Sequence, residues 1–282
     1  MQYRHVIITR FNVLFRELAH KRVDAKGLDA SWLAERFDLF ERYCLPSVLA
    51  QTSQEFIWLV YFNAATPPSF VERARRACAG RDNIRLLFCD IYDHALLERD
   101  LRAELIPKPE WLLTTRLDND DGLRRDFVKR VHENLRFMGA EAINFPNGIV
   151  YAGGKTYSHR DESNAFLSLL EPFEGFKTVL CVQHPEMAQV AFVRQIEGEP
   201  AWLQVIHDSN IRNRVRGWRV SAGTALAGFA FAGEKTPRRH AEAKLMLLVD
   251  NLLYGAWRVA RDTSIEMAKS LRRGAKSLRS KG

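Results

Sequence analysis

The sequence predicts an α/β protein with a mostly parallel sheet flanked by helices, and two observations lead to that prediction. Short runs rich in β-branched and aromatic residues alternate with segments of helical apolar spacing throughout residues 5–138. The chain has 282 residues, of which 46% are hydrophobic, so it can fill one large α/β core or two small ones. This composition excludes a largely disordered chain.

The expected elements follow from apolar period and turn residues. In chain order they are a strand at 5–9, a helix over 31–50 capped by Asp29 or Ser31, a strand at 55–63, a helix from Pro68 to Cys78, a strand at 84–89, a helix at 96–105, a strand at 111–116 and a helix after Gly122. Pro46 should kink or restart the helix in which it lies. Further strands are expected at 142–146 and 148–151, before an irregular turn at Gly153 and Gly154, and a long helix from residue 240 to residue 281.

Composition also suggests where the protein works. Its cysteines, Cys44, Cys78, Cys89 and Cys181, form no CxxC pair, so neither a zinc site nor a disulfide framework is indicated. They fit buried thiols in a reducing compartment. The apolar run near the N-terminus is too short for a signal peptide, and no later segment is long enough to span a bilayer. We therefore expect a cytoplasmic protein.

The formal net charge of +8 is concentrated at the C-terminus. Residues 266–282 carry six Lys and Arg against one acid, a net charge of +5. Apolar residues keep a narrow stripe opposite these charges, at Ile265, Ala268, Leu271, Ala275 and Leu278. We expect a basic amphipathic helix that docks on an anionic membrane surface, with a solvated tail as the alternative. No basic stripe elsewhere favours a nucleic-acid partner.

An acidic cluster, Asp118, Asp120 and Asp121, follows the strand at 111–116. Three carboxylates so close together repel one another, so a fold that gathers them usually supplies a cation or an arginine. On an extended segment, Asp118 and Asp120 would point the same way. The alternative is a solvated acidic turn that caps the next helix.

Several motifs together resemble a known family. Cys44-Leu-Pro-Ser-Val-Leu-Ala-Gln-Thr52, followed by a strand and then by a strand ending in Asp-x-Asp, resembles the nucleotide-sugar half of GT-A glycosyltransferases. Arg10-Phe-Asn12, Thr115-Arg-Leu-Asp-Asn-Asp-Asp121 and Trp202-Leu-Gln-Val-Ile-His-Asp-Ser-Asn210 look like a bacterial rhamnosyltransferase family, over residues 5–220. The resemblance implies a GT-A (Rossmann-like) domain over 1–235, with a nucleotide-sugar half at 1–123 and an acceptor half at 124–235. Residues 236–282 would be a helical basic extension.

The resemblance also implies a reaction and its cofactors. The enzyme would move a sugar, rhamnose by the family's name, from a UDP- or dTDP-sugar to a glycan or lipid-linked acceptor. Mn²⁺ or Mg²⁺ would stabilise the charge on the departing diphosphate. The implied metal ligands are Asp118, Asp120 and His207, and the implied nucleotide contacts are Arg10, Asn12, Asn63, Arg116, Asp118 and Arg212. Asn63 stands where related enzymes usually carry an Asp, so its amide would contact the base without charge.

An inverting enzyme also needs a carboxylate base beside the acceptor hydroxyl. Five carboxylates are available, at Asp161, Glu162, Glu171, Glu186 and Asp208, and we take Glu186 and Asp208 as the candidates. Two other functions stay open. The same acidic site would serve a nucleotide-sugar hydrolase or phosphotransferase, and the basic tail alone would serve a polyanion- or membrane-binding module.

Overall fold

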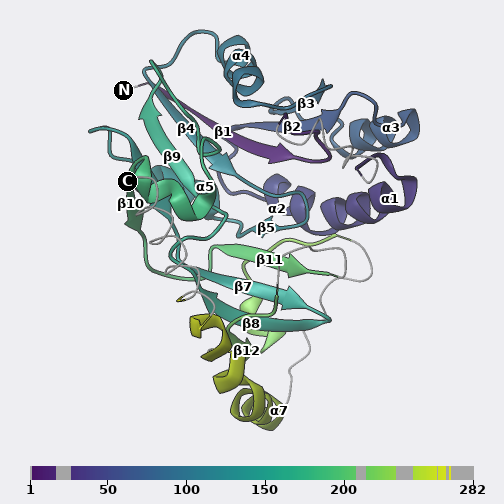
Figure 1. Ribbon diagram of the computed structural model, residues 1–282, viewed down its shortest axis with the longest axis vertical. Helices are drawn as coiled ribbons and strands as arrows, with labels where there is room; N and C mark the ends of the chain where they lie inside the picture. The colour runs from purple at the N-terminus through teal and green to yellow at the C-terminus, as the bar shows by residue number, and fades with distance from the viewer. Residues whose placement is uncertain are drawn as a thin grey trace, which may run out of the picture.

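The computed structural model describes residues 2–16, 27–207, 214–232, 244–258, 260–264 and 267, and in these residues two sheets organise the chain. The larger sheet has seven strands in the order β10-β6-β9-β4-β1-β2-β3, and the smaller has five in the order β12-β8-β7-β11-β5. Helices cover the larger sheet, and the smaller sheet lies between it and the C-terminal helix (Figure 1). The predicted mixed α/β class is confirmed.

The amino-terminal half alternates strictly between strands and helices. Its elements are β1 (Tyr3–Arg10), α1 (Ala30–Leu39), η3 (Phe40–Cys44), α2 (Leu45–Leu49), β2 (Ile57–Asn63), α3 (Pro68–Ala77), β3 (Ile84–Cys89), α4 (His94–Glu104) and β4 (Trp111–Arg116). β1 pairs in parallel with both β2 and β4, and β2 pairs in parallel with β3. The parallel core predicted for residues 5–138 is therefore confirmed, and so is the helix after Gly122, α5 (Phe127–Glu133).

The first helical stretch changes its winding at the predicted place. The carboxylate of Asp29 accepts the backbone N–H of Trp32 and caps α1. Before Pro46 the helix widens into the π-helical segment η3, where Leu45 N–H bonds to Phe40 C=O. A proline has no N–H to donate and its ring crowds the preceding turn, so a local rewinding relieves the helix without ending it.

The second half of the chain completes both sheets. Its elements are β5 (Gly122–Leu123), β6 (Glu141–Asn144), β7 (Asn147–Ala152), β8 (Lys155–Arg160), β9 (Ser168–Pro172), η4 (His184–Gln189), β10 (Phe192–Gln195), β11 (Trp202–Ile206), β12 (Trp218–Val220) and α6 (Ala222–Ala225). β9 runs antiparallel between β4 and β6, which makes the larger sheet mixed. The turn expected at Gly153 and Gly154 joins β7 to β8.

Alternate residues of the central strands fill two cores. Ile7 faces the core under α1 and η3, and Val6 and Ile8 face the core under α4. Strands buried on both faces read as continuous apolar runs, as β2 does. The two sheets meet at Trp202, which stacks on Phe166 with 5.0 Å between ring centroids.

The C-terminal segment is helical, as predicted, over α7 (Lys244–Asp250), η5 (Asn251–Gly255) and the described residues up to 264. Residues 265, 266 and 268–282 lie outside the described residues. The apolar stripe of the predicted basic helix falls among them: Ile265, Ala268, Leu271, Ala275 and Leu278. Within the described part of the chain, no helix combines the length and apolar character needed to cross a bilayer.

Candidate active site

Charged side chains gather where β1 and β4 end at the same edge of the larger sheet. Ile8 pairs with Arg116, so Arg10 and Arg116 lie on neighbouring strand ends. Arg116 donates two hydrogen bonds to Asp118, from Nη2 to Oδ2 at 2.9 Å and from Nε to Oδ1 at 3.2 Å. Burial would raise the pKa of Asp118, but Arg116, and then Arg10 and His184, outweigh it and lower that pKa. Asp118 is therefore an ionised carboxylate fixed by arginine.

A second guanidinium group, that of Arg10, lies near Asp118 and Arg116 at the same edge. Burial and the neighbouring Arg116 lower the pKa of Arg10, although Asp118 opposes them. Arg10 also lies over the ring of Phe15, with its guanidinium carbon 5.1 Å from the ring centroid. Arg10 and Arg116 are thus close enough for their positive charges to repel, and an added anion such as a diphosphate would stabilise both.

Asp120 lies beside this cluster and contacts two other elements. Its Oδ2 is 2.6 Å from Nη1 of Arg36 on α1 and 2.9 Å from Nε2 of His207 after β11. The other ring nitrogen of His207 is 3.6 Å from a carboxylate oxygen of Glu35. The structure thus brings together Asp120 and His207, separated by 87 positions in the sequence, and adds Arg36, which sequence reasoning missed.

Asp121 turns inward and has a structural contact. Its Oδ1 accepts the backbone N–H of Val205 at 2.9 Å, which fastens β11 to the strand end. Burial, with Asp120 and Asp118 nearby, raises the pKa of Asp121 well above its usual range. The backbone turns here, with Asp121 N–H on the carbonyl of Asp118 at 3.3 Å. The prediction that residues 118–120 are extended is therefore wrong. Because a turn separates Asp118 from Asp120, the two carboxylates contact different partners.

The three residues expected to bind the metal do not converge on one point. Asp118 is held by Arg116, whereas Asp120 and His207 meet each other. Among the residues that the structure describes, no three His, Cys, Asp or Glu side chains are placed to hold a metal ion together. The carboxylate and imidazole of Asp120 and His207 have the donor chemistry that Mn²⁺ accepts, with Arg36 on the same carboxylate oxygen.

Asn12 and Asn63 form a hydrogen-bonded turn at the ends of β1 and β2. Asn12 accepts the N–H of Asn63 at 3.1 Å and donates to Gly27 C=O and to Thr66 Oγ1, both at 3.0 Å. The side-chain oxygen of Asn63 accepts the N–H of Ala65 at 2.8 Å. These contacts fix the turn at the strand ends, and they use polar atoms of Asn12 and Asn63 that were expected to touch a nucleotide base.

The candidate bases are spread over several elements. Glu186 is half-buried on η4. Glu171 accepts two backbone N–H groups, from Lys177 and Thr178, at 2.8 Å each, and burial raises its pKa, so it holds a loop. Asp161 accepts the N–H of Ser163 at 2.8 Å, and Glu162 pairs with an exposed Arg160. Asp208 and the proposed phosphate contact Arg212 lie outside the described residues.

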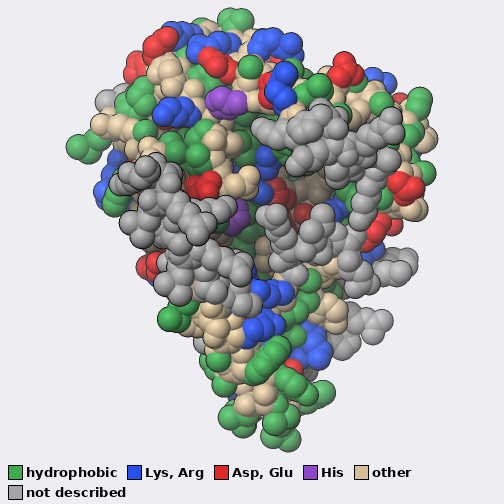
Figure 2. Space-filling view, in the orientation of Figure 1, with side chains coloured by type: hydrophobic (Ala, Val, Ile, Leu, Met, Phe, Trp, Pro, Cys, Tyr) green, Lys and Arg blue, Asp and Glu red, His purple; other side chains and the backbone are tan. Residues whose placement is uncertain are grey.

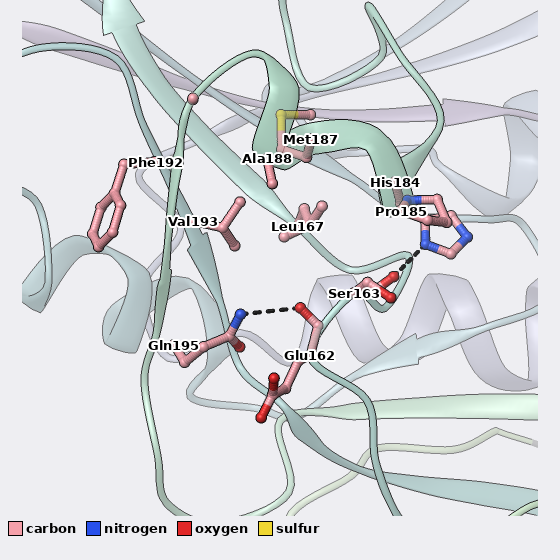
Figure 3. A pocket seen from close by; sticks show the side chains of 11 residues that line it. Glu162, Ser163, Leu167, His184, Pro185, Met187, Ala188, Phe192, Val193 and Gln195 are labelled. Atoms are coloured by element: carbon pink, nitrogen blue, oxygen red, sulfur yellow. Dashed lines mark hydrogen bonds between the residues drawn. The ribbon is translucent and has the colours of Figure 1, made fainter. Parts of the chain in front are cut away.

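A pocket of about 380 Å³ opens beside the strand ends, and His184 lies at one end of it (Figure 3). Its walls include Ser163, Leu167, Met187, Phe192 and Val193, whereas Glu186 does not line it. Nδ1 of His184 contacts the carbonyl oxygen of Ser163. Burial lowers the pKa of His184, and Arg116 and Asp118 also act on it, so the pocket adjoins the charged edge. Sequence reasoning missed His184, although this residue lies two positions before the candidate base Glu186.

Comparison with known proteins supplies a family. Residues 4–219 match the model of the family described as "Putative rhamnosyl transferase". No curated protein matches the chain. Among solved structures, S. aureus TarS 1-349 in complex with UDP-GlcNAc has a TM-score of 0.43 and 9% sequence identity, covering 74% of this chain and 60% of that one. The inositol-1-phosphate CTP transferase from T. maritima has a TM-score of 0.36 and 8% identity, covering 75% of this chain and 94% of that one.

The chain thus spans 60% of the length of the TarS fragment. The family model covers more than three quarters of the sequence, including β1, β4, the acidic cluster and His207. The resemblance found in the sequence is confirmed, and the chain belongs to the family described as "Putative rhamnosyl transferase".

Proposed function

We propose that this protein is a glycosyltransferase that moves a sugar, rhamnose by the family's description, from a nucleotide-sugar donor to a glycan or lipid-linked acceptor. One observation carries the proposal: Arg10, Arg116, Asp118 and Asp120 meet at the carboxyl edge of a parallel sheet in a chain of this family. Ligands of open α/β sheets bind at this edge.

The arginines would hold the diphosphate of a UDP- or dTDP-sugar. Arg10 lies near Arg116, which bonds to Asp118, so a diphosphate placed between the two arginines would gain charge-assisted hydrogen bonds and relieve their mutual repulsion. The bond between sugar and diphosphate breaks with negative charge on the leaving oxygen, and fixed guanidinium groups stabilise that charge. Asp118 bonds to Arg116 and would accept a hydrogen bond from ribose.

We further propose that Asp120 and His207 bind a divalent cation. When bound, Mn²⁺ or Mg²⁺ would neutralise the charge that develops on the diphosphate. Arg36 contacts the same oxygen of Asp120 and supplies positive charge there itself. Binding of the cation would therefore displace Arg36 from that oxygen or use the second oxygen of the carboxylate. Asp208, which follows His207 in the sequence, remains a proposed base.

The acceptor would bind in the pocket beside His184. Its volume of about 380 Å³ lies at the small end of ligand sites and suits one or two sugar rings. Apolar walls at Leu167 and Val193, with the exposed ring of Phe192 at the rim, would pack against the C–H face of a sugar.

We also propose that the protein is cytoplasmic. Its cysteines are unpaired thiols, which fits a reducing compartment: Cys44, Cys78, Cys89 and Cys181.

Nucleotide release tests the proposal. The full chain is incubated with UDP- and dTDP-sugars, including dTDP-rhamnose, with and without saccharide acceptors and with Mn²⁺, Mg²⁺ or chelator. We expect release from one nucleotide class that rises at least tenfold with acceptor. Equal release without acceptor would identify a hydrolase, and no release or nucleotide binding with any donor would contradict the proposal. Activity that persists in chelator would contradict the proposed divalent cation but not the proposed sugar transfer.

A further inference from the structure

The C-terminal helix has its faces reversed relative to an ordinary surface helix. Its large apolar side chains point to solvent, with exposed fractions between 55% and 70%: Leu245, Leu248, Leu252, Leu253, Tyr254 and Trp257. In a globular protein such residues normally form the face that packs on the core. Figure 2 shows hydrophobic side chains gathered at the lower end of the molecule, where Figure 1 labels α7.

The opposite, polar face is the one that docks on the protein. Asn251 makes two hydrogen bonds to the backbone of Arg219 on β12, at 2.8 and 2.9 Å. Arg258 is buried, bonds to Asp250 at 3.0 Å and lies over the ring of Tyr157. Gly255 lets the helix come close, because a Cβ there would lie 2.5 Å from the ring of Trp218. The apolar face is thus directed outward by specific contacts.

We propose that this outward face, residues 245–257, is a membrane-docking surface that lies in the headgroup region of an anionic lipid layer. Charge identifies the occupant. Residues 244–282 contain nine Lys and Arg against three Asp and Glu, a net charge of +6 out of +8 for the whole chain. An anionic surface attracts that charge, whereas a second copy of the chain would bring the same charge to the same place and be repelled.

Geometry and composition support the same occupant. The face lies at one end of the long axis of the molecule, remote from the larger sheet, so a flat surface can reach it (Figure 1). Trp257 and Tyr254 belong to it, and these rings favour the interface between lipid and water. A helix that lies in the interface needs an apolar face and basic residues but no bilayer-spanning length. The expectation from the sequence placed docking in the basic amphipathic helix after residue 264, whereas the described structure offers the helix before it.

Sedimentation of the full-length protein with vesicles tests the docking surface. One set contains phosphatidylcholine alone and the other contains one quarter phosphatidylglycerol, each in low and high salt. We expect binding to the anionic vesicles that is at least tenfold stronger than to the neutral ones and that weakens in high salt. The double variant Leu248→Glu/Leu252→Glu should lower binding to anionic vesicles at least tenfold.

The matched control is Ile106→Glu/Met138→Glu, which places the same charges at apolar residues that are 80% and 92% exposed elsewhere. It should bind like the unchanged protein. Both variants alter exposed side chains, and an unchanged melting temperature verifies that they fold. Brominated lipid provides a second measurement, because it should quench a fluorescence component that Trp257→Phe removes.

Three results would overturn the proposal. The unchanged protein could remain in the supernatant with anionic vesicles at low salt. The helix variant could bind as well as the control, which would assign attachment to the basic tail alone. Finally, light scattering could show a dimer that the helix variant abolishes, with no vesicle binding, which would identify a second copy as the occupant.

Discussion

The strand-end cluster and the C-terminal helix depart from ordinary burial in opposite ways. At the ends of β1 and β4, charged groups are buried: the side chains of Asp120 and Arg36 are only 10% and 13% exposed. On the helix, large apolar groups are exposed, and buried polar contacts hold the helix in place. Both arrangements cost folding free energy, one by desolvating charge and the other by exposing hydrocarbon.

Each region lacks a different stabilising partner. Buried guanidinium groups that repel each other are stabilised by an anion, whereas an exposed apolar face is stabilised by an apolar layer. Each region would thus be completed by a partner of opposite character, and the two partners belong to one reaction if the acceptor is lipid-linked. Variants that alter one region and leave the other unchanged test this separation.

The largest effect is expected at Asp120. Asp120→Asn removes the negative charge that faces Arg36 and His207, so the proposed cation would lose a carboxylate ligand and turnover should fall on the order of 100-fold. The fold should survive, because the amide keeps one oxygen for Arg36. Steady-state nucleotide release and a thermal melt measure the two effects.

Glu141→Gln is the matched control for Asp120→Asn. Glu141 forms a buried pair with Arg194, and each side chain is 12% exposed, at a sheet position without a proposed ligand. Its loss should cost about 1–3 kcal/mol of stability and leave turnover unchanged. Equal losses of turnover in the two variants would show that Asp120 is merely structural.

Periodicity predicted the sheet well because local signals determine it. The strands at 84–89 and 111–116 coincide with prediction, since each is an apolar run bounded by turn residues. β9 escaped prediction because its short Ser168–Pro172 run carries no alternation, and its partners lie far away in the sequence. The site shows the same limit. Strand ends pointed to Arg10 and Asp118, but the pairing of Arg36 with Asp120 spans 84 positions, so no local pattern could reveal it.

The next effect concerns helix docking. Arg258→Ala removes the bond to Asp250 and the contact with Tyr157, so the helix should open more often. A lost charged hydrogen bond of about 2 kcal/mol corresponds to roughly thirtyfold faster hydrogen exchange over residues 244–258. Nucleotide binding at the strand ends should not change. Weaker nucleotide binding in this variant would show that the two regions are coupled.

A smaller effect is expected at the diphosphate position. Arg116→Lys keeps the positive charge but loses the pair of hydrogen bonds that the guanidinium group donates to Asp118. The dissociation constant for UDP or dTDP should therefore rise about tenfold, which corresponds to about 1.4 kcal/mol of binding free energy. Calorimetric titration measures it. Arg160→Lys, at an exposed arginine on β8, serves as the control and should bind nucleotide normally. If the control weakens binding equally, Arg116 has no special role.

The smallest effect tests whether every buried polar group marks a binding site. His5 on β1 is buried and bonds to His132 at 2.9 Å and to Thr115 at 2.8 Å, so its hydrogen bonds are satisfied within the fold. Burial, with His132 beside it, lowers the pKa of His5 well below its usual value, so the folded protein keeps it neutral. Below about pH 6.5, His5 binds a proton in the unfolded chain but stays neutral in the folded chain, so the free energy of unfolding falls.

His5→Gln should therefore flatten the loss of stability between pH 6.5 and pH 5, where one excluded proton contributes up to about 1.4 kcal/mol per pH unit. Urea unfolding at several pH values measures the slope, which is independent of any constant loss caused by the substitution. Nucleotide affinity at pH 7 should stay unchanged, because His5 bonds to His132 on α5 and to Thr115 on β4, and neither is a proposed nucleotide contact. A buried network with satisfied bonds would then differ from the strand-end cluster in function as well as in charge. Reduced nucleotide affinity in His5→Gln would instead show that the sheet interior and its edge act as one unit.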